Sequence, residues 1–79
     1  MYNQLLDTFI TVADCGSFTK AAEQLYISPT AVMKKMNTLE KHLEVKLIDR
    51  TPSGIRLTSA GKVIYQDAKF MIDYTNVHV

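Results

Sequence analysis

The stretch ISPTAVMKKMNTLEKHL, residues 27–43, most constrains what this chain can fold into. Ser28 suits the N-cap of a helix, and Pro29 suits its first position, where the missing N–H costs nothing. Apolar side chains then recur at spacings of four, three and four, at Val32, Met36, Leu39 and Leu43. This periodicity predicts a helix over about 28–43 with one face packed on a core. Its opposite face would carry four polar side chains, with Met33 at the edge: Thr30, Lys34, Asn37 and Lys41.

Two shorter helices are predicted before this one. Apolar residues at helical spacing from Leu5 to Ala13 predict a helix over about 3–14, which should end at Gly16. Ser17 is a candidate N-cap for a second helix, whose apolar stripe would comprise Phe18, Ala21, Ala22 and Leu25. Only the short segment YIS separates that helix from the third. Two short helices, a tight turn and a longer helix with a polar outer face describe a helix-turn-helix.

A hairpin and a fourth helix should follow. The segments VKLIDR and GIRLT read as two short strands, with TPSG as the turn between them. Thr58 can cap a last helix, SAGKVIYQDAKFMIDYTN. The expected fold is mostly α, a winged helix-turn-helix with a three-helix core, a two-stranded wing and a long C-terminal helix. We expect a winged domain over 1–58 and a C-terminal helix over 59–79.

Charge is distributed unevenly along the 79 residues, although the net charge is only +1. Residues 28–62 hold seven cations against three acids, and both flanks are slightly acidic. A basic middle suits a face presented to a polyanion. The alternative is a solvated surface that happens to be uneven.

Other functional classes find little support. One cysteine, Cys15, allows no disulfide within the chain, and no apolar run approaches the ~20 residues that span a bilayer. No secretory signal is visible, so we expect a cytoplasmic protein, associated with the nucleoid and not with a membrane. His42 and His78 are isolated, and no spacing suggests a metal site, a phosphate loop or a catalytic triad. We therefore expect no metal, no cofactor and no enzymatic activity.

The polar face of the third helix favours DNA binding. A B-DNA major groove admits one α-helix, whose N-terminal residues can reach base edges while lysines farther along contact the backbone. A hairpin directly after such a helix can touch the flanking backbone or minor groove. A three-helix core with a solvated outer face remains the structural alternative.

Several ordered motifs carry a family resemblance. GSFTKAAEQLYIS followed by AV, then LE, VKLIDR and IRLTSAG, resembles the N-terminal DNA-binding domain of LysR-type transcriptional regulators. The similarity runs from about Phe9 to Gly61. It implies sequence-specific binding to a pseudo-palindromic operator, with the third helix in the major groove and the wing, about 47–57, on flanking backbone or minor groove. It also implies that residues 59–79 form a linker or dimerisation helix, and that a small-molecule effector would bind only to a downstream domain that is absent here.

The resemblance assigns roles to individual positions. Ala21, Ala22 and Leu25 would be contacts between helices. The predicted DNA-binding residues are Ser28, Pro29, Thr30, Met33, Lys34, Asn37, Lys41, Arg50, Ser53 and Arg56. Arg50 could instead pair with Asp49 or Glu40.

The sequence departs from the family pattern at informative positions. Pro29 stands where the family often has Gln, Met33 where it usually has Ser, and Glu44 where it has Gly. Pro52 and Ser53 occupy wing positions that often carry Gly and Arg. Met33 can still contact a thymine methyl group. These departures keep a second hypothesis open, that of a winged-helix protein-interaction module without specific DNA binding.

The last helix carries more apolar surface than packing on one small domain requires. We expect a homodimer through this helix, with contacts from Val63, Ile64, Phe70, Met71 and Tyr74. The alternative is that a downstream domain covers the same surface.

Overall fold

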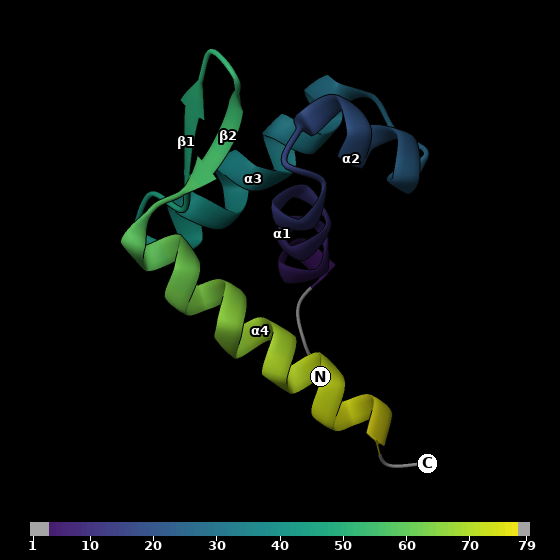
Figure 1. Ribbon diagram of the computed structural model, residues 1–79, viewed down its shortest axis with the longest axis vertical. Helices are drawn as coiled ribbons and strands as arrows, with labels where there is room; N and C mark the ends of the chain where they lie inside the picture. The colour runs from purple at the N-terminus through teal and green to yellow at the C-terminus, as the bar shows by residue number, and fades with distance from the viewer. Residues whose placement is uncertain (1–3, 78–79) are drawn as a thin grey trace.

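Three helices form the body of the protein (Figure 1). A computed structural model describes residues 4–77, and the side chains of residues 4–70. Helix α1 spans Gln4–Cys15, α2 spans Phe18–Leu25 and α3 spans Pro29–Leu43. The predicted boundaries are confirmed to within one or two residues. Gly16 ends α1 with φ +70°, a left-handed conformation that glycine adopts at little cost.

Local capping determines where α2 and α3 begin. The Ser17 hydroxyl accepts a hydrogen bond from the backbone N–H of Lys20 at 3.3 Å. The Ser28 hydroxyl does the same for Ala31 at 3.1 Å, and Pro29 occupies the first turn of α3. Each cap satisfies one of the N–H groups that a helix start leaves without an intrahelical partner.

A two-stranded hairpin follows α3. Strand β1, Ile48–Thr51, pairs antiparallel with β2, Gly54–Leu57, so that Asp49 lies opposite Arg56 and Arg50 opposite Ile55. Helix α4, Ser59–Val77, begins at the predicted cap, where the Thr58 hydroxyl accepts the Gly61 N–H at 2.9 Å. The order α–α–α–β–β–α confirms the winged helix-turn-helix expected from the sequence.

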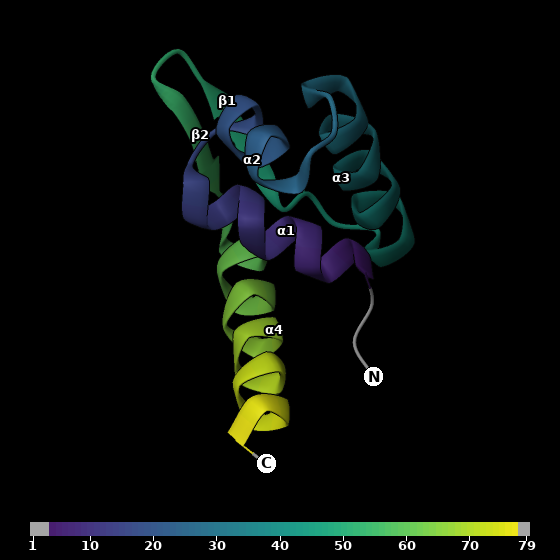
Figure 2. The ribbon, with the colours of Figure 1, turned by 90° about the vertical axis from the view of Figure 1, so that its right-hand side faces the viewer.

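The core lies where α1, α2, α3 and the first residues of the wing meet. Its buried side chains are Phe9, Val12, Ala21, Ala22, Val32, Met36, Leu39, Leu47 and Ile48. The paired alanines are 0% and 2% exposed, which confirms their role as close helix contacts. Helix α4 leaves this body and runs away from the hairpin along the 40 Å long axis, as two perpendicular views show (Figure 1, Figure 2).

Leu43 is wrong as a predicted core residue, since it is 39% exposed. The apolar periodicity of α3 extends one turn farther than its packing partners do. The next residue, Glu44, ends the helix with φ 58°, and Tyr26 ends α2 with φ 59°. Both are left-handed positions where glycine would be unstrained.

Candidate nucleic-acid interface

The face of α3 opposite the core is exposed and polar. Val32, Met36 and Leu39 are at most 3% exposed, and they fix the helix by its inner side. The residues of α3 that are predicted to bind DNA lie on the outer side of the helix. Met33, and also Lys35, is half-buried at the margin of this side. The exposed residues are Ser28, Pro29, Thr30, Lys34, Asn37 and Lys41. The helix therefore presents short polar side chains at its start and lysines along its length.

The charges of Lys34 and Lys41 on this face are not neutralised by acidic side chains within residues 4–70. Among the side chains described, residues 4–70, neither Lys34 nor Lys41 forms an ion pair with an acidic residue. The ion pair seen in this range joins α4 to α1, between Lys69 and Asp14 at 3.8 Å. Uncompensated cations on one face raise the local positive potential, which attracts a polyanion.

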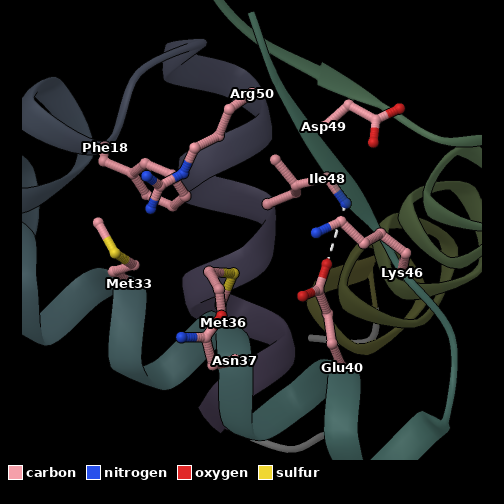
Figure 3. A pocket seen from close by; sticks show the side chains of 9 residues that line it. All are labelled: Phe18, Met33, Met36, Asn37, Glu40, Lys46, Ile48, Asp49 and Arg50. Atoms are coloured by element: carbon pink, nitrogen blue, oxygen red, sulfur yellow. Dashed lines mark hydrogen bonds between the residues drawn. The ribbon is translucent and has the colours of Figure 1, made fainter.

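The hairpin lies alongside α3 on the side of Met33 and Asn37. These two side chains line a shallow hollow together with Phe18, Ile48 and Arg50 (Figure 3). The hollow measures about 170 Å³, below the roughly 300–1,000 Å³ of ordinary small-molecule pockets. The wing and the outer face of α3 thus form one continuous surface.

The predicted DNA-binding residues of the wing are exposed as well. Ser53 lies exposed in the turn and Arg56 lies exposed on β2. Arg50 makes no ion pair with Asp49 or Glu40 in the described part of the chain. Its guanidinium carbon lies 5.1 Å from the centroid of the Phe18 ring instead.

Glu40 holds the wing against α3, a role that the sequence analysis did not assign. One carboxylate oxygen, Oε2, accepts the backbone N–H groups of Leu47 at 2.7 Å and Ile48 at 3.1 Å. The second of these bonds is drawn in Figure 3. Hydrogen bonds to a carboxylate are shorter and stronger than neutral ones. The sequence contained one signal for this role of Glu40, namely an acidic residue on the apolar side of α3, close to the segment that joins α3 to β1.

Helix α4 is packed on one side and exposed on the other. Ala68 is 3% exposed, and the Tyr65 hydroxyl donates to Asp14 of α1 at 2.5 Å. Of the predicted dimer contacts, Ile64 is half-buried against the core, whereas Val63 and Phe70 are 58% and 69% exposed. Met71 and Tyr74 lie outside the residues whose side chains are described.

The described residues show neither a metal-binding cluster nor a membrane-spanning helix. No group of three or more His, Cys, Asp or Glu side chains there could hold a metal ion. No helix in the same range is both long enough and apolar enough to cross a membrane.

Comparison with known proteins places this surface in context. The family model described as "Bacterial regulatory helix-turn-helix protein, lysR family" matches residues 3–62. The HTH-type transcriptional regulator CysL of Bacillus subtilis is 42% identical over 72 residues, 91% of this chain and 24% of CysL. The HTH-type transcriptional activator AaeR of Escherichia coli is 38% identical over 74 residues, 92% of this chain and again 24% of the relative's length. The chain thus spans about a quarter of the length of these relatives.

A solved structure shares the whole architecture. The DNA-binding domain of CbnR, crystallised with DNA, superposes with a TM-score of 0.86 at 34% identity, covering 96% of this chain and 87% of that one. The match extends beyond the core to the wing and most of α4. This chain belongs to the lysR family of bacterial regulatory helix-turn-helix proteins.

Proposed function

We propose that this chain binds double-stranded DNA sequence-specifically, as the DNA-binding part of a transcriptional regulator in the bacterial cytoplasm. The observation that carries the proposal is the outer face of α3. This face is polar and cationic, and it is exposed over its length. The inner side of α3 is packed in the core beside the wing. A helix held in this way can enter a major groove without rearrangement of the domain.

The order of residues along α3 supports a division of labour. Thr30 and Met33 lie in the first turns, where a docked helix comes closest to base edges. Asn37 carries the amide that pairs with adenine, and the Met33 thioether suits a thymine methyl group. Lys34 and Lys41 can contact phosphates or, in the case of Lys34, a guanine. Ser53 and Arg56 of the wing would contact the flanking backbone or minor groove.

The comparisons favour DNA over a protein partner. The CbnR domain with a TM-score of 0.86 was crystallised with DNA, and the curated relatives are transcriptional regulators. The polar and cationic face of α3 is also poorly suited to a protein interface, whose centre is depleted in lysine. A winged-helix module without DNA binding is therefore the less supported hypothesis.

Binding as a homodimer through α4 belongs to the same proposal. Val63 and Phe70 leave apolar surface exposed on the side of α4 that faces away from α1. Two copies related by a two-fold axis would read two half-sites of a pseudo-palindromic operator. Sedimentation velocity at micromolar concentration should show a dimer that Val63→Glu weakens and that Gln24→Glu, which adds the same charge at an exposed position of α2, does not. A strictly monomeric wild-type chain would contradict this part of the proposal.

The test of function begins with selection of bound sequences from a random duplex library. We expect one enriched motif, bound at least a hundredfold more tightly than a scrambled duplex. Lys34→Ala should weaken binding to both duplexes, or relax the specificity if Lys34 reads a guanine. Lys69→Ala removes the same charge from α4 and serves as the matched control. Equal affinity of the wild-type chain for selected and scrambled duplexes would contradict the proposal.

A further inference from the structure

The contact between Phe18 and Arg50 joins two segments that are distant in sequence. Phe18 is the first residue of α2, and Arg50 lies in the middle of β1. The Arg50 guanidinium carbon lies 5.1 Å from the ring centroid, within the ~6 Å over which a cation is attracted to an aromatic face. Figure 3 shows the guanidinium in front of the ring, with the Met33 side chain of α3 beside both. The three side chains also line a common hollow.

Strand geometry explains why Arg50 finds this partner and not an acid. Successive side chains of a strand point to opposite faces, so Arg50 and its neighbour Asp49 are directed apart. Asp49 lies opposite Arg56 in the hairpin register. The Glu40 carboxylate is occupied by two backbone N–H groups of the wing. Stacking on Phe18 is the contact that remains within reach.

A stacked arginine keeps its full capacity to bind an anion. The contact with the ring uses the flat face of the guanidinium, whereas its N–H donors lie around the edge of the plane. Arg50 is exposed, and it forms no ion pair within residues 4–70. A planar fork of donors held at one place matches the two oxygens of a phosphate. Ordering the long side chain before binding also reduces the entropy lost on association.

We propose that Phe18 is a positioning residue, which holds the Arg50 guanidinium beside Met33 so that it meets a backbone phosphate at the edge of the groove that α3 enters. The inference rests on the proposed function and adds a residue outside the recognition helix and the wing. Phe18 itself contacts no DNA in this account.

The competing explanation is that Phe18 only packs on the core. It is half-buried against the buried cluster, so its truncation could act through folding. Phe18→Leu keeps an apolar side chain of similar size and removes the aromatic face. Arg50→Gln removes the charge but keeps a polar side chain at the same exposed position of β1. The double variant completes a cycle that separates the two explanations.

The experiment measures the affinity of the four proteins for the selected duplex at several salt concentrations. Arg50→Gln should weaken binding and reduce the slope of log K against log salt by about 0.9, the value for one phosphate contact. Phe18→Leu should weaken binding by about two- to fivefold in the wild-type background. The same change should have almost no effect when Arg50 is already Gln. Equal losses in the two backgrounds, or no loss in the wild type, would overturn the inference.

A second measurement uses only the wild-type chain, so its result does not depend on whether a variant folds. In the free wild-type chain, proton NMR should show the Arg50 side-chain resonances shifted upfield by the ring current of Phe18. Unshifted resonances would overturn the stacking on which the inference depends. If the wild-type chain does not bind the duplex at all, the proposed function fails and the inference fails with it. If it binds normally and the cycle is additive, only the role of Phe18 is lost.

Discussion

Replacement of Gly61 by alanine tests how closely the start of α4 packs against the segment that joins α3 to β1. A Cβ at this position would lie 2.2 Å from the carbonyl oxygen of Leu47 and 3.1 Å from its carbonyl carbon. The same oxygen accepts the backbone N–H of Thr58 at 3.0 Å. The Thr58 hydroxyl in turn donates to the Lys46 carbonyl at 2.5 Å. The start of α4 therefore packs directly against Lys46 and Leu47, the two residues before β1.

Two effects of opposite sign compete in Gly61→Ala. Alanine is favoured over glycine in a helix interior by about 1 kcal/mol, and by less in the first turn, where Gly61 is the third residue of α4. The clash with Leu47 needs a shift of about 1 Å, and overpacking of this kind costs about 1–3 kcal/mol. The shift would also weaken the Thr58–Leu47 hydrogen bond, which is worth about 1 kcal/mol. The steric effect should prevail, with a net loss of about 1–3 kcal/mol in the free energy of unfolding.

Urea unfolding followed by circular dichroism measures this loss. Protein concentration must be fixed, because a dimer through α4 would make the stability depend on it. Gln66→Ala, at an exposed position in the same helix, is the matched control and should change stability by less than about 0.5 kcal/mol. A Gly61→Ala variant as stable as the wild type, or more stable, would refute the close approach of α4 to Leu47.

Substitutions at two further positions test other parts of the scaffold. Glu40→Ala removes the acceptor of two N–H groups on buried residues and should cost about 2–4 kcal/mol, whereas Glu40→Gln keeps an amide oxygen and should cost less than half of that. Thermal unfolding compares the pair, and equal losses would contradict the role of these bonds. Tyr26→Gly relieves a left-handed backbone and should stabilise the fold by about 0.5–1 kcal/mol. Tyr26→Ala retains the Cβ, so a similar gain in urea unfolding from that variant would rule out this cause.

Much of the fold was predictable because its signals are local. Ser17 and Ser28 cap their helices by hydrogen bonds within three residues, and Thr58 does the same for α4. The alternation of strand residues and the TPSG turn are equally short-range. Together with the family motifs, these features predict the order of the six elements that the structure describes between residues 4 and 77.

Features that depend on how the elements meet were not predictable. Leu43 continues the apolar period of α3, yet it is 39% exposed at the end of the helix, whereas Val32 and Met36 are buried. The sequence offered Arg50 two acids as partners. Only the packing of the hairpin on α3 shows that Glu40 is occupied by the backbone and that Phe18 lies within reach.

The candidate site was predictable as a surface, since the same period that buries one face of α3 exposes the other. Which side chains touch bases is decided by how the helix docks, and the departures at Pro29 and Met33 prevent transfer of a contact scheme from relatives. Phe18 and Glu40 were overlooked as functional residues because each acts through another group.

The most direct test of the account is a titration of the isotope-labelled chain with its selected duplex, followed by backbone amide NMR. A face of α3 that enters the major groove predicts the largest chemical-shift changes at Thr30, Met33 and Lys34, with smaller ones on the wing from Arg50 to Arg56. Amides at the exposed residues of α4, such as Val63, should change little. Tight binding with the largest changes on α4, and none on the outer face of α3, would contradict the central claim.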